Sequence, residues 1–255
     1  MINVLVAGFP GAMGQKVVNM LNQHDDFKLT AIFNPVVLDL DPTEYGLDAD
    51  VKVWHSYDEI EAGVADVWVD FTTPKAVAQN IEAAINHGIH PVVGTSGMAA
   101  EDQQRVIALA AEKHVGGLIA PNFGISAVLL MQFAAQAAKY FPDAEVIEMH
   151  HEDKLDAPSG TARATAEMIA QARTAQPRPT TDDPAHGEKI AGVPVHAVRL
   201  PGYVAHEQVL FGAPGEALTI RQDSFDRESF MSGVAVAISK VQGLDTLVVG
   251  LEHLL

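Results

Sequence analysis

Short apolar runs alternate with helix-like segments through the first half of the chain. The runs are rich in Val, Ile and Leu, and the segments between them have helical apolar spacing. This alternation is typical of βαβ units, in which parallel strands form a sheet with helices on both faces. The expected strands are residues 2–7, 28–33, 66–71, 90–95 and 116–123, and the expected helices are residues 13–21, 74–87 and 99–113. The sequence therefore predicts an α/β fold in which residues 1–123 form a doubly wound parallel sheet.

The pattern changes after Asn122. We expect a long Ala-rich helix, a strand, a loop and a second helix, then three strands, and finally helix-like spacing with a break at Gly243. These segments are residues 125–140, 144–151, 161–175, 195–200, 206–212, 216–224 and 230–255. Residues 124–232 are expected to form a second, α+β domain with a mixed sheet. Residues 233–255 are expected to pack back onto the first domain.

A polar connector precedes the last strands. Residues 174–194, "TAQPRPTTDDPAHGEKIAGVP", carry four prolines and little apolar periodicity. Such a segment is most simply a surface loop or a flexible flap.

The composition limits the kinds of ligand and compartment. The chain has 33 Asp and Glu, 16 Lys and Arg and a formal net charge of -17, so we expect no nucleic-acid partner and no membrane partner. The 255 residues include no cysteine, which excludes disulfides, thiolate nucleophiles and Cys-ligated metals. The N-terminal apolar run is too short for a signal peptide or a membrane span, and we expect a cytoplasmic protein.

A glycine-rich turn follows the first expected strand and leads into the first expected helix. The stretch "AGFPGAMG" places Gly8, Gly11 and Gly14 in this turn. Backbone N–H groups and a helix N-terminus in that context favour a dinucleotide site over glycines that serve only close packing. Pro10 departs from the common G-x-G-x-x-G pattern, because proline lacks an N–H and cannot adopt positive φ.

The end of the second expected strand bears on cofactor choice. A loop specific for NAD usually offers an acidic residue there to the ribose 2′-hydroxyl. This chain has Asn34 followed by Pro35, and no Arg or Lys occurs between Asn34 and Lys52. An amide binds a hydroxyl and does not repel a 2′-phosphate. NADH and NADPH therefore both stay open as the cofactor.

Titratable residues crowd the stretch "EMHHEDKLDAPSGTA", residues 148–162. A metal site is disfavoured, because the adjacent residues His150 and His151 point to opposite faces of a strand, and we expect no bound metal. A solvated loop is the commonest fate of such a run of charges.

The third interpretation of this stretch is an anion and proton site. Lys154 provides a positive charge, and Ser159 caps the following helix. The N–H groups of Gly160 and Thr161 then face an anion such as a carboxylate. Histidine exchanges a proton near neutral pH.

The motif E-M-H-H-x-x-K-x-D-A-P-S-G-T-A resembles the signature of the dihydrodipicolinate reductase family, the 4-hydroxy-tetrahydrodipicolinate reductases of bacterial lysine biosynthesis. Further segments resemble that family in the same order over nearly the whole chain. They are "VAGFPGAMG", "DVWVDFTTP", "PVVGTSG", "APNFGIS", "RLPGYVAHEQVLFG" and "LTIRQDSFDRESFMSGV". The resemblance implies a Rossmann-like first domain, a second domain that binds substrate and forms the oligomer, and a homotetramer.

The resemblance also implies site residues. The cofactor is expected at the carboxyl ends of strands, where ligands bind in open sheets. The cofactor residues are Gly8, Phe9, Pro10, Gly11, Ala12, Met13, Gly14, Asn34, Gly94, Thr95, Ser96, Ala120, Pro121, Asn122 and Phe123. The family often has Arg or Lys where this chain has Ala12, and an acid or a base near Asn34, so the departures leave the cofactor preference open.

For the second domain the resemblance implies that His150 donates or accepts the proton and that Lys154 is a second proton donor. His151, Gly160 and Thr161, with Ser159 beside them, are implied to hold the carboxylates of a small dicarboxylate substrate. The implied reaction is hydride transfer from NADH or NADPH to a cyclic dicarboxylate imine, with addition of a proton and loss of water.

Other functions compete with this one. Another NAD(P)-dependent reductase of amino or imino acids would lack the paired histidines and the K-x-D-A-P-S-G-T context. A non-catalytic dinucleotide-binding sensor would have no need for an acid such as His150 or Lys154. A hydrolase that uses Ser159 is disfavoured, because no G-x-S-x-G elbow surrounds that serine.

Overall fold

The computed structural model describes residues 1–179 and 184–255. The chain divides into two compact units. The first unit comprises residues 1–123 and 230–255, and the second comprises residues 124–229. Within the predicted connector, residues 180–183 lie outside the described residues.

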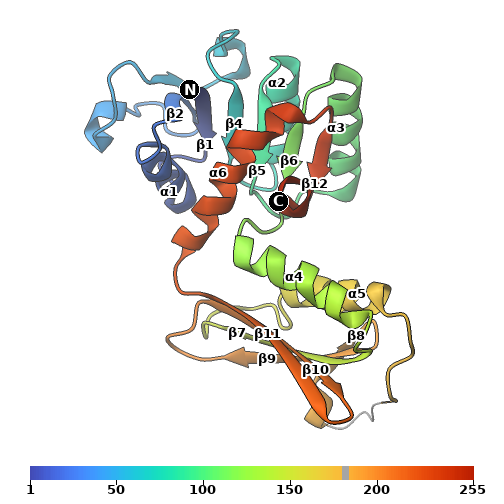
Figure 1. The fold of residues 1–255 in the computed structure, drawn as a ribbon. Coiled ribbons are helices and arrows are strands. Elements are labelled where there is room, and N and C mark those ends of the chain that lie inside the picture. Colours follow the sequence, from blue (N-terminus) through green and yellow to red (C-terminus); the bar gives the residue numbers. More distant parts are fainter. Residues whose placement is uncertain (180–183) are drawn as a thin grey trace. The chain divides into compact units, whose positions relative to one another are not determined.

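The first unit contains a seven-stranded sheet in the order β12-β6-β5-β4-β1-β2-β3, and every neighbouring pair is parallel (Figure 1). The strands are β1 (Ile2–Ala7), β2 (Phe27–Phe33), β3 (Lys52–Trp54), β4 (Val67–Asp70), β5 (His90–Val93), β6 (Gly117–Ile119) and β12 (Leu247–Val249). The helices are α1 (Ala12–Leu21), α2 (Val77–Asn86), α3 (Ala100–Lys113) and α6 (Met231–Lys240). The predicted doubly wound parallel sheet is confirmed, and its strand order reverses between β1 and β4.

Two strands of this sheet differ from the sequence prediction. No strand was expected at β3, and helix-like spacing was expected where β12 lies. β12 pairs with β6, and the two glycines at the start of β6 allow this approach. A Cβ on Gly116 would lie 2.2 Å from the Leu244 carbonyl oxygen, and one on Gly117 would lie 2.6 Å from Leu247 Cδ1. Residues 247–249 therefore form the edge strand β12, and helix α6 ends before them.

The second unit contains a mixed five-stranded sheet in the order β11-β10-β7-β9-β8. β7 and β9 are parallel, and the other pairs are antiparallel. The elements are α4 (Ile125–Ala138), β7 (Asp143–His150), α5 (Gly160–Ala172), β8 (Glu188–Ile190), β9 (Val193–Arg199), β10 (Ala205–Ala213) and β11 (Glu216–Ser224). The predicted α+β unit with a mixed sheet is confirmed. The expectation of a loop throughout residues 174–194 was wrong, because β8 and the start of β9 lie there.

Short 3-10 helices connect these elements. They are η1 (Pro42–Tyr45), η2 (Tyr57–Glu59), η3 (Pro184–His186), η4 (Arg227–Phe230), η5 (Val241–Gly243) and η6 (Leu251–Leu254). No helix of the described residues is long and apolar enough to span a membrane.

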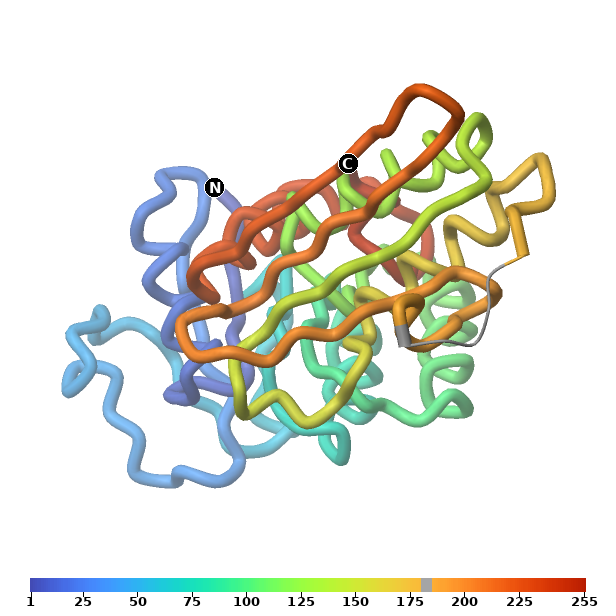
Figure 2. The backbone as a smooth tube through the Cα atoms, turned by 90° about the horizontal axis from the view of Figure 1, so that it is seen from below, coloured from blue at the N-terminus to red at the C-terminus, as the bar shows by residue number. Residues whose placement is uncertain are grey.

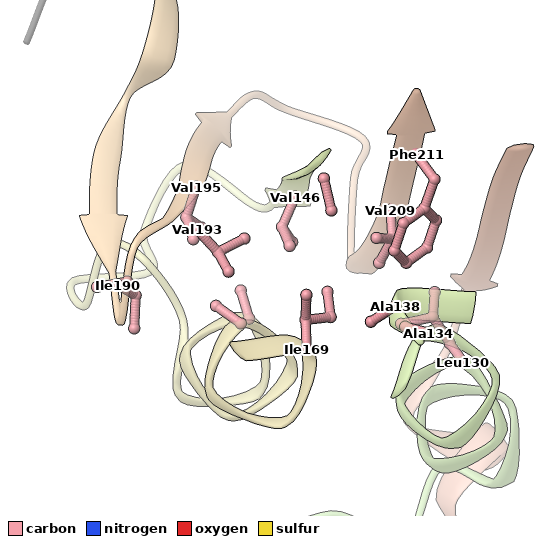
Figure 3. Close-up of a cluster of buried hydrophobic side chains, with 13 residues drawn as sticks. Leu130, Ala134, Ala138, Val146, Ile169, Ile190, Val193, Val195, Val209 and Phe211 are labelled. Atoms are coloured by element: carbon pink, nitrogen blue, oxygen red, sulfur yellow. The ribbon is translucent and has the colours of Figure 1, made fainter. Parts of the chain in front are cut away.

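Both helices of the second unit cover the same face of its sheet. Figure 3 shows Val146, Val195 and Val209 pointing from three strands toward Ile169 of α5 and the residues of α4. Each fully buried side chain of this kind stabilises the fold by roughly 1.5–3 kcal/mol relative to an exposed one. Alternate residues of the same strands point to the outer face, which Figure 2 shows in front of the helices. At one end of the inner face the apolar residues give way to polar ones.

Candidate active site

Helix α5 begins at the polar end of the inner sheet face, after the loop of residues 151–158. Ser159 is its N-cap, and the Ser159 hydroxyl accepts a hydrogen bond from the Ala162 N–H at 3.2 Å. The predicted helix cap is therefore confirmed. No acidic residue lies in the first turn of α5, so nothing on the helix itself offsets the positive end of its dipole. Ser159 is only 2% exposed, and its hydroxyl faces the protein.

His150 is the last residue of β7 and is bound to a buried carboxylate. Its Nδ1 lies 2.6 Å from Oε2 of Glu148, a residue with no exposed surface. Burial raises the pKa of Glu148, but hydrogen bonds from His150, Arg199 and the Ser159 N–H together lower it to about 2. An ionised carboxylate only accepts hydrogen bonds, so Nδ1 of His150 carries the proton. Nε2 is then the ring nitrogen left for a ligand.

Arg199, the last residue of β9, binds the loop to the same carboxylate. Its two terminal nitrogens donate to both oxygens of Glu148, at 2.7 and 2.8 Å. The guanidinium also donates to the backbone carbonyls of Lys154, at 3.3 Å, and Asp156, at 2.6 Å. A bidentate pair of this kind is geometrically specific. One buried carboxylate thus fixes the positions of the histidine, the arginine and the loop between them.

Lys154 lies on this loop and pairs with a carboxylate of the chain itself. Its Nζ donates to Oδ1 of Asp156 at 2.6 Å. That hydrogen bond is the main reason that the pKa of Asp156 is lowered, and the Gly160 N–H contributes as well. The lysine and the start of α5 therefore already bind a carboxylate together, as the anion-site interpretation expected for a ligand. A Cβ on Gly160 would meet no atom within 4 Å, so open space lies beside this residue.

His151 follows β7 and forms a turn with Lys154, whose N–H donates to the His151 carbonyl at 3.2 Å. Within residues 1–179 and 184–255, no group of three or more His, Cys, Asp or Glu side chains is placed to share a metal ion.

Glu148 and Arg199 were not predicted from the sequence as site residues. One signal was present for Glu148, since it precedes His150 by two residues on a strand and therefore shares its face. Arg199 had no local signal, because its partner is 51 positions away in the chain. The register of β7 against β9, which pairs His150 with Arg199, brings them together.

The glycine loop of the first unit lies between β1 and α1. Gly8 has φ of +100°, and a Cβ there would lie 2.3 Å from the Phe71 carbonyl oxygen. A Cβ on Gly14 would lie 2.7 Å from the Gly8 carbonyl oxygen. Gly11 precedes α1 without a side-chain cap, and the first turn of α1 has no acidic residue. Close packing thus requires these glycines, and the free helix N-terminus fits a pyrophosphate as well.

Asn34 holds this loop from the end of β2. Its Nδ2 donates to the Phe9 carbonyl at 2.8 Å. Its Oδ1 accepts hydrogen bonds from the N–H groups of Val36, at 2.9 Å, and Val37, at 3.0 Å. Both ends of the Asn34 amide are therefore used within the protein, and they fix the glycine loop against residues 34–37.

Residues 94–96 follow β5 and are held by a buried acid at the end of β4. The Thr95 hydroxyl donates to Oδ1 of Asp70 at 2.7 Å, and its oxygen accepts from the Thr72 N–H at 2.7 Å. Burial raises the pKa of Asp70, and hydrogen bonds from Thr95, Thr72 and Asn80 oppose this. A Cβ on Gly94 would lie 2.1 Å from the Phe71 ring. Thr95 was predicted from the sequence, but Asp70, whose carboxylate binds Thr95 and Thr72, was not.

The segment after β6 mixes buried and exposed residues. Ala120 and Phe123 are buried, and the Phe123 ring packs 5.8 Å from that of Phe71. Pro121, like Ser96 after β5, is exposed. All of the predicted cofactor residues thus follow parallel strands or begin α1, at one edge of the sheet.

A cavity of about 310 Å³ lies at the carboxyl ends of β1, β2 and β4. It is lined by residues 8–11, 33–37 and 71–73, together with Tyr57, Ala76 and Asn80. This is where the strand order reverses, and dinucleotides bind at such a point in doubly wound sheets. The lining contains no acidic and no basic residue. A neutral, largely apolar cavity beside a glycine loop fits part of a dinucleotide.

Family models match both halves of the chain. The model described as dihydrodipicolinate reductase, N-terminus, matches residues 2–123, and the model described as dihydrodipicolinate reductase, C-terminus, matches residues 126–255.

Curated relatives match over the full length. The 4-hydroxy-tetrahydrodipicolinate reductase of Lactobacillus acidophilus is 57% identical over 99% of this chain and 98% of its own length. The enzyme of the same name from Streptococcus suis is 51% identical over 100% of this chain and 99% of its own.

Solved structures agree with these matches. A dipicolinate-bound dihydrodipicolinate reductase from Paenisporosarcina sp. TG-14 aligns over 100% of both chains, with a TM-score of 0.88 and 41% identity. A probable dehydrogenase from Thermotoga maritima, at 12% identity and a TM-score of 0.68, shares the fold alone.

Proposed function

The chain belongs to the dihydrodipicolinate reductase family, and from that premise we propose that it reduces 4-hydroxy-tetrahydrodipicolinate to tetrahydrodipicolinate with NADH or NADPH. One hydride and one proton are added to the substrate, and one water is lost. The reaction belongs to the diaminopimelate route of lysine biosynthesis. We place this activity in the cytoplasm, which a chain without cysteine suits.

The arrangement of His150, Glu148 and Arg199 beside the start of α5 carries this proposal. It combines a histidine of fixed tautomer with a lysine and a helix N-terminus. These are the groups that a reaction on an unsaturated dicarboxylate needs, because one must move a proton and the others must hold negative charge. In a chain with a net charge of -17, such positive groups have to be concentrated locally.

In this proposal the residues of the loop have different roles. Lys154 and the N–H groups of Gly160 and Thr161 hold a substrate carboxylate in the position where Asp156 now binds. His151 binds the substrate as well, and buried Ser159 contributes by capping the helix. His150 acts in its doubly protonated form, in which Glu148 holds the Nδ1 proton and Nε2 donates the other, and Lys154 is the second donor. Glu148 keeps His150 in the required tautomer.

The nicotinamide cofactor supplies the hydride when it is bound. The glycine loop of residues 8–14 and the N-terminus of α1 would hold its pyrophosphate, with residues 94–96 and 120–123 at the same edge of the sheet. Asn34 would act chiefly by holding the loop, since both ends of its amide are already used.

The experiment that tests the function is a turnover assay. The assay mixes purified protein with 4-hydroxy-tetrahydrodipicolinate and NADH or NADPH. It follows the loss of absorbance at the nicotinamide band. We expect turnover with the natural protein, and a loss of about 100-fold or more in kcat/KM for Lys154→Ala, from the lost charge and the lost proton donor together. Absence of turnover with both cofactors would contradict the proposal.

Cofactor binding is tested separately from turnover. A Cβ at Gly8 would clash with the Phe71 carbonyl, so Gly8→Ala is expected to weaken NADH binding, measured by nicotinamide fluorescence, by at least about tenfold. Gly243→Ala is the control, because a Cβ there meets no atom within 4 Å. Equal affinity of the two variants would argue against a cofactor at this loop.

We also propose a homotetramer formed through the outer face of the second unit's sheet, with residues 124–232 as the substrate-binding and oligomerisation domain. None of the described helices of that unit covers this face, and Ile147, Val198 and Leu210 belong to it by strand alternation. An uncovered sheet face that combines apolar and polar side chains is suited to contact with another copy of the chain.

A further inference from the structure

A second buried carboxyl lies beside Glu148. Glu207 on β10 is paired with Glu148 on β7 and with Gln222 on β11. Its side chain points to the helix-covered face, because Val209 of the same strand points there (Figure 3). Glu207 is 2% exposed and Glu148 is 0% exposed. Two carboxyl groups thus lie next to each other on the inner face of the sheet, at the end that carries His150.

The two carboxyls have different partners. Glu148 has the three donors described above, one of which is the charged guanidinium of Arg199. Oε1 of Glu207 has no hydrogen-bond partner among the residues that the structure describes. Its hydrogen-bonding neighbour is Thr165 of α5. The Thr165 hydroxyl has one hydrogen, which it donates to the Thr161 carbonyl at 3.0 Å. Thr165 therefore does little to compensate an ionised Glu207 for its burial.

The surroundings of Glu207 favour its protonated form. The titratable neighbours on the adjacent strand β7 are Glu148, directly opposite Glu207, and His150, two residues further along the same face. β11 contributes the amide of Gln222, α5 contributes Thr165, and α4 contributes Ser126, whose hydroxyl donates to Oε1 of Gln222 at 3.3 Å. Burial, and then the charge of Glu148, raise the pKa of Glu207 to about 7 against the opposing effect of Thr165.

We propose that Glu207 is a positioning residue of the substrate site, which in its protonated form leaves Glu148 as the single buried negative charge at this end of the sheet. When Glu207 ionises, a second carboxylate competes with Glu148 for its donors and repels a bound dianion. Binding of a dicarboxylate is therefore strongest while Glu207 is protonated. This inference rests on the proposed function, because the dicarboxylate is the substrate named there.

The test uses dipicolinate, a stable dicarboxylate, as the probe. Its affinity for the natural protein and for Glu207→Gln is measured by calorimetry at about pH 6 and pH 8, on either side of the pKa of Glu207. For the natural protein we expect a loss of about tenfold between the two pH values, the order of magnitude of repulsion between like charges at an effective dielectric constant near 20. Glutamine cannot ionise, so the variant should keep most of its affinity at the higher pH. The comparison between the two proteins isolates the part of the pH dependence that belongs to residue 207.

A second measurement observes the carboxyl group directly. Infrared spectra of protein labelled with carbon-13 in glutamate alone are expected to show a protonated carboxyl at the lower pH that disappears at the higher one. The label excludes Asp70, whose pKa burial also raises. Of the four glutamates Glu59, Glu145, Glu148 and Glu207, the first three have a lowered pKa and Glu207 has a raised one. This band is measured in the natural protein, so it tests the protonation of Glu207 even if Glu207→Gln does not fold.

Two results would overturn the proposal. One is the same pH dependence of dipicolinate affinity in both proteins, and the other is no protonated glutamate in the natural protein at pH 6. Neither measurement depends on turnover. A failed reductase assay would therefore count against the proposed function and leave the role of Glu207 to be judged from binding and spectra.

Discussion

At the scale of single residues, Glu148 determines how His150 and Arg199 are used. It accepts hydrogen bonds from both and from the Ser159 N–H. In Glu148→Gln the neutral amide no longer fixes the proton on Nδ1 of His150 and no longer pairs with the guanidinium. We expect kcat/KM to fall by about 100-fold, the usual contribution of an acid–base group. Steady-state kinetics, with circular dichroism to confirm folding, measure this.

The matched control for this substitution is Glu145→Gln on the same strand. Like Glu148, Glu145 accepts hydrogen bonds from side chains of other elements. Its partners are His186 and His196, both at 2.8 Å, and it lies on the outer sheet face. We expect its kcat/KM to stay within about threefold of the natural value. If both variants lost activity equally, a specific role of the inner-face carboxylate would be excluded.

Which site residues were predictable depends on how local their signals are. Ser159 was found because a serine before a helix is a cap, and Lys154 because a cation in an acidic chain stands out. Arg199 carries no such signal, because its contact with Glu148 depends on the pairing of β9 with β7. Glu207 was missed for the same reason, since only the register of β10 places it opposite Glu148.

At the scale of elements, the first turn of α5 connects stability with ligand binding. Removing the cap in Ser159→Ala leaves the buried Ala162 N–H without its partner. We expect a loss of about 1–2 kcal/mol in local stability. Hydrogen exchange of peptides from α5 should therefore be faster in the variant. Dipicolinate affinity should also fall, because the first turn of the helix frays and its N–H groups are no longer held in position.

Ser239→Ala is the control for this cap. The Ser239 hydroxyl donates to the Ala235 carbonyl within α6, on an exposed part of the helix, and caps nothing. Its removal should leave exchange in α5 unchanged. A Ser159→Ala variant with unchanged exchange in α5 would show that the cap does not stabilise the helix.

Elements were predictable where apolar periodicity is sustained over many residues, as in α3, α4 and β7. β8 and β12 were missed because each has only three residues, too few to show a period. Each is extended because it pairs with a neighbouring strand, the longer β9 in one case and the equally short β6 in the other. Tertiary pairing, which a single sequence does not display, decides the conformation of such short segments.

At the scale of the whole molecule, the buried carboxyl of Glu207 makes stability depend on pH. The folded pKa is about 7 and the ordinary value is 4.5, so the folded state binds more protons between these pH values. The stabilisation is complete below the ordinary value and is lost as pH rises through the folded one. The difference between these two pKa values corresponds to about 3 kcal/mol.

Glu207→Gln removes this dependence, because glutamine does not titrate. The free energy of unfolding of the variant, relative to that of the natural protein, should therefore rise by about 3 kcal/mol between about pH 4.5 and pH 8. Urea unfolding at several pH values measures the difference. A constant difference across this range would mean that the natural Glu207 is ionised throughout.

The proposed assembly of the protein is tested at the outer face of the second unit's sheet. In the proposed homotetramer Leu210, which is 36% exposed on that face, is covered by another copy of the chain. Leu210→Arg would then bury a charge without a partner, which costs roughly 3 kcal/mol or more and raises the dissociation constant about 100-fold. Sedimentation should show a tetramer for the natural protein and smaller species for the variant. Leu38→Arg, at a site 71% exposed in the first unit, should sediment like the natural protein. A natural protein that sediments only as a monomer would contradict the assembly, since no copy would then cover this face.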